Sequence, residues 1–179
     1  RENNRSINPV KSIGDILILS REPQIRQLIS SPALLLAFGF GSGLVKKAPG
    51  TLGTLAAVPF WYLLSNLPLT AYVVIIYLAT VIGIIVCEKA STKLGVHDHG
   101  GIVWDEFVGF WIAMCPVSPS AINLVVGFIL FRGLDIFKPW PISWLDQNIH
   151  GGLGIMLDDI AAGLVTAMLM VMLGNLGLL

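Results

Sequence analysis

The sequence predicts an all-α, compact multi-helix bundle that is embedded in a membrane. Hydrophobic residues make up 55% of the 179 residues, the mean hydropathy is +0.79, and only 12% of the residues are charged. Soluble domains carry about 25% charged residues, so the charge content is far below that of a soluble protein. Apolar runs alternate with short polar segments, and none shows the strict period of two that is typical of a β-strand. The net charge of zero gives no indication of nucleic-acid binding.

The apolar runs are candidate helices of unequal length. The run at 70–87 is the clearest membrane-spanning segment, because a crossing requires about 20 apolar residues. The run at 52–67 contains Pro59, and the other runs are 107–115, 121–131 and 160–173. Several of these runs are short, so we expect tilted, partly submerged or re-entrant helices among them.

The first 31 residues differ from the rest of the chain. They are polar, and their basic residues are Arg1, Arg5, Lys11, Arg21 and Arg26. Loosely spaced apolar residues between these charges predict an amphipathic segment on a membrane surface, which Pro23 interrupts. We therefore divide the chain into an N-terminal amphipathic segment, residues 1–31, and a membrane-embedded domain, residues 32–179.

The distribution of basic residues predicts which helix ends lie together. Beyond the N-terminal segment the relevant residues are Lys46, Lys47, Lys89, Lys93, Arg132 and Lys138, whereas the turns at 65–69 and 116–120 carry no charge. Basic loops remain on the cytoplasmic side of a membrane. The runs 52–67 and 70–87 then form one hairpin and the runs 107–115 and 121–131 a second. The last helix leaves from the same cytoplasmic edge.

Five acidic residues are expected to meet at this edge. Asp105 and Glu106 open one helix, Asp135 closes the next, and Asp158 and Asp159 open the last one. A carboxylate at a helix start can simply be a cap, worth roughly 0.3–1 kcal/mol. Capping does not account for Asp135, because the helix dipole disfavours an acid at a C-terminus. We therefore expect the five carboxylates to form one site.

Converging carboxylates repel one another unless a cation lies between them, and magnesium fits such a site. Mg²⁺ prefers oxygen ligands and is typically held by a few carboxylates together with a substrate phosphate. Arg132, Asp135 and Lys138 are spaced by three residues and share one helix face. Arg132 and Lys138 can thus meet the remaining charge of a phosphate group, or they are ordinary residues of a membrane interface.

Several segments of the chain resemble the phosphatidylglycerophosphatase A family. These segments are Gly39–Gly43, Pro49–Thr51, His97–Gly100, Ile102–Gly109, Phe131–Ile142 and Gly151–Asp159. The resemblance implies an all-helical phosphatase of the bacterial inner (cytoplasmic) membrane, dependent on magnesium, with its site facing the cytoplasm. It also implies hydrolysis of phosphatidylglycerophosphate to phosphatidylglycerol and inorganic phosphate. The residues that match the family motifs are the pair Asp105 and Glu106, the group of Arg132, Asp135 and Lys138, and the pair Asp158 and Asp159.

Other residues of these segments are weaker candidates. Ser42 and Thr51 could contact phosphate, but a tight glycine turn and a helix N-cap explain them equally well. Asp98 is a candidate carboxylate at or beside the metal, and its neighbours His97 and His99 are more typical of a polar loop than of a metal site. The glycines at 151, 152 and 154 could form a mobile flap or simply close a loop.

We expect one magnesium ion held by Asp105, Glu106 and Asp159, with Asp135 and Asp158 near it and a water molecule as the nucleophile. The Asp-x-Asp-x-Thr/Val pattern of one class of covalent phosphatases is absent from the sequence. A phosphatase for another lipid head group is the alternative within the enzyme class. Two non-phosphatase functions remain open, an ion or proton transporter, which predicts acids in mid-helix, and a non-catalytic membrane scaffold.

Overall fold

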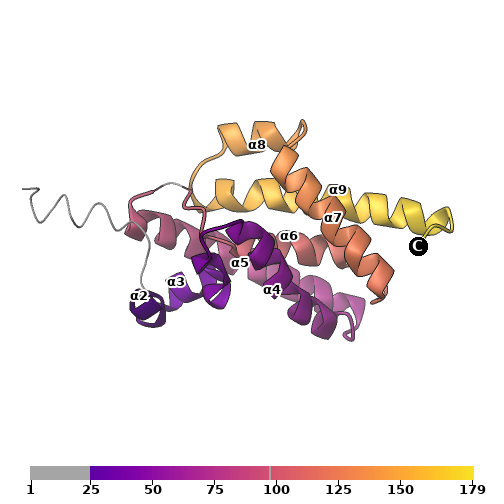
Figure 1. Ribbon diagram of the computed structural model, residues 1–179, viewed down its shortest axis with the longest axis horizontal. Coiled ribbons are helices and arrows are strands. Elements are labelled where there is room, and N and C mark those ends of the chain that lie inside the picture. Colours follow the sequence, from indigo (N-terminus) through magenta and orange to yellow (C-terminus); the bar gives the residue numbers. More distant parts are fainter. Residues whose placement is uncertain (1–24, 97) are drawn as a thin grey trace, which may run out of the picture.

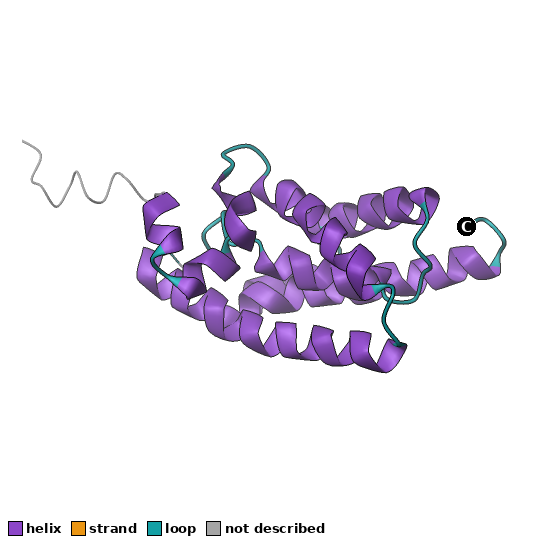
Figure 2. Cartoon of the chain, turned by 90° about the horizontal axis from the view of Figure 1, so that it is seen from below, coloured by secondary structure: helices purple, strands orange, loops and turns teal. Residues whose placement is uncertain are grey.

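The computed structural model of the chain describes residues 25–96 and 98–179, and these residues contain helices and no strand (Figures 1 and 2). The elements are α2 (Ile25–Ile29), α3 (Pro32–Ala37), the 3₁₀ helix η1 (Gly39–Leu44), α4 (Pro49–Leu64), α5 (Leu69–Leu94), α6 (Trp104–Met114), α7 (Ala121–Phe137), α8 (Ile142–Asn148) and α9 (Gly151–Asn175). The predicted all-α class is confirmed for this part of the chain. Most of the expected amphipathic segment, up to residue 24, lies outside the described residues.

Helix α6 forms the centre of the bundle. It packs against α4, α5, α7 and α9, and all but one of its residues are buried. Trp104 and Trp111 donate their indole N–H groups to the carbonyl oxygens of Ala79 in α5 and Ala57 in α4, each at 3.1 Å. These bonds satisfy the polar edge of each buried indole and fix α6 against its neighbours. Because α6 has only 11 residues, it is too short to cross a bilayer alone.

Two glycines allow α6 and α9 to approach closely. A Cβ atom at Gly163 would collide with the carbonyl oxygen of Gly109, and one at Gly109 would lie 2.7 Å from the carbonyl oxygen of Asp159. Gly109 lies one turn after Asp105, and Gly163 lies one turn after Asp159, so each pair shares a helix face. The glycine contact therefore brings the acidic residues of the two helices together.

Helices α5 and α9 are long and apolar enough to cross a bilayer, with 26 and 25 residues. In the most apolar part of α5 only 22% of the residues are buried, and side chains such as Val74, Tyr77 and Leu78 are exposed. A helix of this composition in a soluble protein would turn most of its surface to the core. The apolar exterior of α5 instead matches a lipid environment.

The last helix starts earlier than the sequence indicated. The prediction that Asp158 and Asp159 open this helix is wrong, because α9 begins at Gly151 and the two acids lie about two turns inside it. The glycines at 151, 152 and 154 are accordingly part of the first turn of α9, and the alternatives of a mobile flap or a loop are also wrong.

Contacts with α5 explain why this glycine-rich stretch is helical. A Cβ atom at Gly152 would collide with the carbonyl oxygen of Ile84, so only glycine permits this approach of the two helices. The carboxylate of Glu88 accepts a hydrogen bond from the N–H of Gly152, at 2.5 Å. A negative acceptor at a helix start stabilises the N–H groups that have no partner within the helix. Tertiary contacts thus offset the low helix propensity of glycine.

The predicted order of helix ends is confirmed at one end of the bundle. Gly50 at the start of α4 lies against Glu106 at the start of α6, and Arg132 near the end of α7 forms an ion pair with Glu106. The contact between Glu88 and Gly152 adds the last part of α5 and the start of α9 to the same end. In Figure 1 α8 lies over the start of α9, whereas the C-terminus lies at the right-hand tip of the molecule, beyond the other end of α9.

Candidate metal and phosphate site

A polar cavity of about 170 Å³ lies where these helix ends meet. Its charged lining residues are Asp98, Asp105, Glu106, Asp135, Lys138, Asp146, Asp158 and Asp159. The five carboxylates that the sequence singled out therefore do converge, although Asp158 and Asp159 reach the cavity from inside α9 and not from its first turn. Asp98, on the loop before α6, also reaches it.

The carboxylates form two groups whose oxygen atoms are close enough to share an ion. Oxygens of Asp105, Glu106 and Asp159 lie within 4.8 Å of one another, and so do oxygens of Asp135, Asp158 and Asp159. Asp159 belongs to both groups. It is also among the most buried charged residues described, with 3% of its surface exposed.

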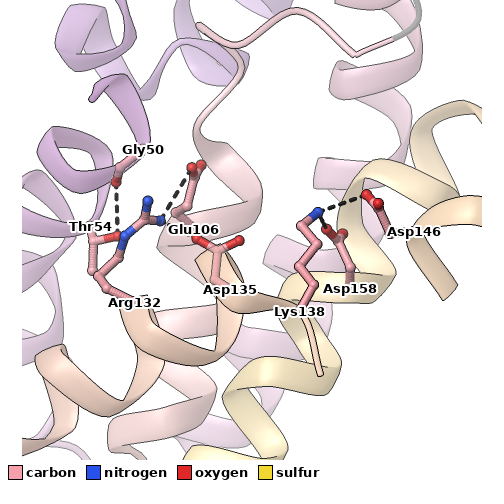
Figure 3. A network of polar contacts seen from close by, with 8 residues as sticks. All are labelled: Gly50, Thr54, Glu106, Arg132, Asp135, Lys138, Asp146 and Asp158. Carbon is pink, nitrogen blue, oxygen red and sulfur yellow. Dashed lines mark hydrogen bonds and ion pairs between the residues drawn. The ribbon is translucent and has the colours of Figure 1, made fainter. Parts of the chain in front are cut away.

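Two basic side chains lie at the border of these groups (Figure 3). Arg132 pairs with Asp135, and its Nη1 atom lies 3.6 Å from Oε1 of Glu106. The ammonium of Lys138 donates to Asp146 at 2.7 Å and to Asp158 at 2.5 Å. Burial acts to lower the pKa of Lys138, but the larger combined effect of these two carboxylates raises it. The net result is a pKa above the ordinary value, so the side chain stays charged.

The basic residues do not satisfy all the buried oxygens. Asp105 Oδ1, Glu106 Oε2, Asp158 Oδ1 and Asp159 Oδ1 are buried and have no hydrogen-bond partner within the described chain. An unpaired buried carboxylate oxygen costs several kcal/mol unless a cation or a proton neutralises it. Carboxylate oxygens alone are the donor set of a hard cation such as Mg²⁺. The residues present therefore fit a hard divalent metal ion.

Burial also changes the proton affinity of the acids on α6. It raises the pKa of Glu106 to about 7, even though hydrogen bonding with Asp105 and the charge of Arg132 act in the opposite direction. Burial, with the adjacent charge of Glu106 as a further cause, raises the pKa of Asp105 well above its ordinary value. A divalent cation would oppose both shifts, because its positive charge favours the ionised forms and lowers the pKa of each acid.

The weaker candidates lie outside the cavity or play structural roles. Ser42 donates its hydroxyl to the carbonyl oxygen of Gly39 at 2.9 Å, within the turn of η1. Thr51 lies in the first turn of α4 beside Gly50, whose backbone approaches Glu106 and Arg132. Neither Ser42 nor Thr51 lines the cavity. His99 accepts the N–H of Gly101 through Nδ1 at 3.1 Å, as expected of a loop residue, and His97 lies outside the described residues.

Comparison with known proteins places the chain in a family. The family model of phosphatidylglycerophosphatase A matches residues 35–174. The chain belongs to this family. It is 49% identical to phosphatidylglycerophosphatase A of Escherichia coli strain K12 over 151 residues, which cover 84% of this chain and 88% of that protein.

Two further relatives support this membership. The phosphatidylglycerophosphatase A of Haemophilus influenzae is 44% identical over 75% of this chain and 83% of its own length. A protein of Bacteroides thetaiotaomicron, provisionally named a phosphatidylinositol-3-phosphatase, is 36% identical over 76% of this chain and 89% of its own length. No solved structure matches this chain.

In this member of the family, the structure adds residues that the sequence analysis missed. Asp146 of α8 shares Lys138 with Asp158, and Glu88 of α5 holds the start of α9. Gly109 and Gly163 set the spacing between α6 and α9. Asp146, Glu88 and Gly163 carried no local signal, because each acts on a residue far away in the sequence. Gly109 was inside a segment that resembles the family, but its contact with α9 could not be predicted.

Proposed function

We propose that this chain is a magnesium-dependent phosphatidylglycerophosphatase, which hydrolyses phosphatidylglycerophosphate to phosphatidylglycerol and inorganic phosphate. The family and its named relatives support the choice of substrate. The structural observation that carries the proposal is the convergence of unpaired carboxylate oxygens from Asp105, Glu106 and Asp159 in one cavity. Buried carboxylate oxygens without partners can hold a cation, and the neighbouring Arg132 and Lys138 can bind the oxygens of a phosphate monoester.

In this proposal Asp105, Glu106 and Asp159 hold the magnesium ion, with Asp135, Asp158 and Asp98 beside it. Bound there, Mg²⁺ would act as a Lewis acid toward a phosphate oxygen and lower the pKa of a water molecule. The close contact of α6 with α9 keeps the three ligands in place before the ion arrives. Preorganised ligands of this kind avoid the cost of moving charged side chains during the reaction.

Arg132 and Lys138 are proposed to bind the oxygens of the phosphate group. Nε of Arg132 is buried and has no hydrogen-bond partner among the described residues, so this side chain retains a donor. The planar guanidinium suits two phosphate oxygens, and the ammonium of Lys138 acts as a point charge. Thr51, which follows Gly50 in the first turn of α4, and Ser42 are proposed as outer contacts of the substrate, and Gly50 itself lies close to Arg132.

The proposed reaction is an in-line displacement at phosphorus. The oxygen of a water molecule forms a bond to phosphorus while the bond from phosphorus to the glycerol oxygen breaks. A carboxylate of the cavity accepts the proton that the water loses, and the leaving glycerol oxygen takes up a proton to give phosphatidylglycerol. Arg132 and Lys138 stabilise the charge that spreads over the remaining phosphate oxygens.

We further propose that residues 32–179 form a membrane-embedded catalytic domain whose cavity faces the cytoplasm. Lys46, Lys47 and Lys93 lie on segments at the cavity end, whereas the turns 65–69 and 116–120 at the other end carry no charge. Basic loops remain cytoplasmic, and this rule supports a position of the cavity among the head groups of the inner leaflet. The phosphate of a lipid would then reach the cavity while its acyl chains remain in the bilayer. Residues 1–31 are proposed as an amphipathic segment on the same surface.

A phosphatase for a different lipid monophosphate is the second candidate, and the Bacteroides relative supports it. The transporter alternative is less well supported. Asp158 and Asp159 do lie within a helix, but they face the same end cavity as Asp105, Glu106 and Asp135 and do not continue along the bundle. A scaffold protein would have no need of unpaired buried carboxylates.

Phosphate release tests the proposed function directly. The purified chain in detergent micelles would be given phosphatidylglycerophosphate, phosphatidylinositol 3-phosphate or phosphatidic acid, with Mg²⁺ present or chelated. We expect rapid release from phosphatidylglycerophosphate, slower release from the other two lipids, and none after chelation. Equal or faster release from another lipid would reject the substrate, and release that survives chelation would reject the magnesium dependence. Ion flux in vesicles without phosphate release would support a transporter instead.

A further inference from the structure

The cavity contains more negative charge than one magnesium ion balances. Seven carboxylates line it, and Arg132 and Lys138 form ion pairs with four of them, Glu106, Asp135, Asp146 and Asp158. Metal binding requires the ionised form of each acid, and with the seven carboxylates, Arg132 and Lys138 all charged, five negative charges remain. One divalent ion would leave three negative charges. A phosphate monoester would then bring roughly two more negative charges into a site of low dielectric constant. Two divalent ions would leave one negative charge before the substrate binds.

We infer that the chain binds two divalent cations, the second between Asp135, Asp158 and Asp159, with Asp159 shared by both ions. The oxygens of these three residues lie within 4.8 Å of one another, as do those of the first group. The inference deepens the proposed phosphatase function by assigning a second metal site to the same cavity. It does not depend on which lipid is the substrate.

Unpaired oxygens in the second group point to a ligand. Asp158 and Asp159 are 8% and 3% exposed, and Oδ1 of each is buried without a hydrogen-bond partner. Lys138 contacts Asp158 through Oδ2, so the ion pair leaves Oδ1 available. Likewise Arg132 contacts Asp135 through Oδ2. The ion pairs with Lys138 and Arg132 are therefore made through one oxygen each of Asp158 and Asp135, and the second oxygen of each residue lies outside them.

The position of Asp159 explains how one residue can serve both ions. It lies on the face of α9 that meets α6, one turn before Gly163. Asp105 and Glu106 approach it from the start of α6, and Asp135 approaches from the last turn of α7. A carboxylate has two oxygens with about four acceptor positions, so it can bridge two cations. Pairs of divalent ions about 3.5–4 Å apart recur in phosphatases and nucleases.

Counting bound Mn²⁺ tests this inference without any lipid substrate. Mn²⁺ shares the preference of Mg²⁺ for oxygen ligands and is paramagnetic. The full chain in micelles would be equilibrated with Mn²⁺, and bound metal would be measured by elemental analysis and electron paramagnetic resonance. We expect two ions per chain, with a spectrum that shows magnetic coupling between them. One ion per chain, or two ions without coupling, would overturn the inference.

Variants assign each ion to its group. We expect Asp135→Asn, Asp158→Asn and Asp105→Asn each to reduce the number of bound ions to one per chain. Asp159→Asn should lower the metal affinity of both sites at least about tenfold. Asp146→Asn is the matched control, because Asp146 lines the cavity but belongs to neither group, and it should keep two ions. A count of two in Asp135→Asn would overturn the assignment. Circular dichroism would show whether each variant folds. If a variant does not fold, the number of Mn²⁺ ions bound by the wild-type chain still tests whether there is a second site.

The outcome is separable from that of the proposed function. Two coupled ions in a chain that releases no phosphate from any lipid would keep the metal site and reject the phosphatase. One bound ion in a chain that hydrolyses phosphatidylglycerophosphate would keep the phosphatase and reject the second site.

Discussion

Gly109 of α6 and Gly163 of α9 meet backbone to backbone, one helical turn from Asp105 and Asp159. The two acids belong to the same candidate metal group. The close approach of Gly109 and Gly163, which have no side-chain functional group, therefore sets the spacing of the helices that carry these two acids. Small residues have this role wherever helices must approach closely in a membrane protein.

Replacing Gly163 by alanine should disturb the metal site from a distance. The new Cβ atom would collide with the carbonyl oxygen of Gly109, so the two helices must move apart. We expect a loss of roughly 1–3 kcal/mol in stability, as for other overpacked sites. We also expect a smaller increase in melting temperature on addition of Mg²⁺, measured by circular dichroism in micelles.

Gly174→Ala is the control for this change, because it lies on the same helix and a Cβ atom there meets nothing within 4 Å. It should retain the wild-type response to Mg²⁺. An unchanged Mg²⁺ response in Gly163→Ala would show that the glycine contact does not position the ligands.

Glu88→Gln should weaken the start of α9. The change removes a negative charge from the first turn of the helix, where the carboxylate now accepts the N–H of Gly152. We expect a loss of about 0.5–2 kcal/mol in the free energy of unfolding, typical of a lost helix cap. Thermal unfolding of the metal-free protein measures it. Glu88 lies outside both acidic groups, so the number of bound metal ions should not change in this variant. Loss of a bound ion would show that the contact of Glu88 with Gly152 also supports a metal site.

The stabilising effect of Mg²⁺ should increase with pH. Burial raises the pKa of Glu106 to about 7, so the metal-free folded protein loses stability as the pH rises from the ordinary pKa of the carboxyl toward 7. Mg²⁺ requires the ionised form, and protons compete with it below that pH. At a fixed Mg²⁺ concentration, the increase in melting temperature should grow from about pH 6 to about pH 8 and then level off.

Glu106→Gln provides the comparison, because its amide cannot ionise. Its Mg²⁺ response should be weaker and should depend less on pH. A wild-type response that is constant across this range would contradict the assignment of Glu106 as a ligand.

The sequence predicted the convergence of the five carboxylates more successfully than it predicted the bounds of the helices that carry them. Asp105, Glu106 and Asp135 lie at the boundaries of apolar runs, and these boundaries are visible in the sequence because a bilayer penalises charge. The uncharged turns then indicated which apolar runs form hairpins, and these hairpins put the acids at one end of the helix bundle. Both steps depend on local composition, so they could be made without tertiary information.

The start of α9 could not be predicted in the same way. Glycines at 151, 152 and 154 indicate a loop from propensity alone, and the helix forms there because Gly152 packs on the backbone of α5 and Glu88 supplies an acceptor. The pairing of Lys138 with Asp146 and Asp158 also depends on tertiary structure. The presence of two acidic groups that share Asp159 follows from the approach of α6, α7 and α9, which no segment of the sequence shows by itself.

The most direct test of the central claim is phosphate release from phosphatidylglycerophosphate by Asp159→Asn, compared with the wild-type chain at saturating Mg²⁺. The change keeps the size of the side chain and removes the charge that both acidic groups share. We predict a decrease of more than about 100-fold in the rate, with the helical content and melting temperature of the metal-free protein retained. A folded Asp159→Asn protein that releases phosphate at nearly the wild-type rate would contradict the claim that these carboxylates hold the metal ion of the reaction.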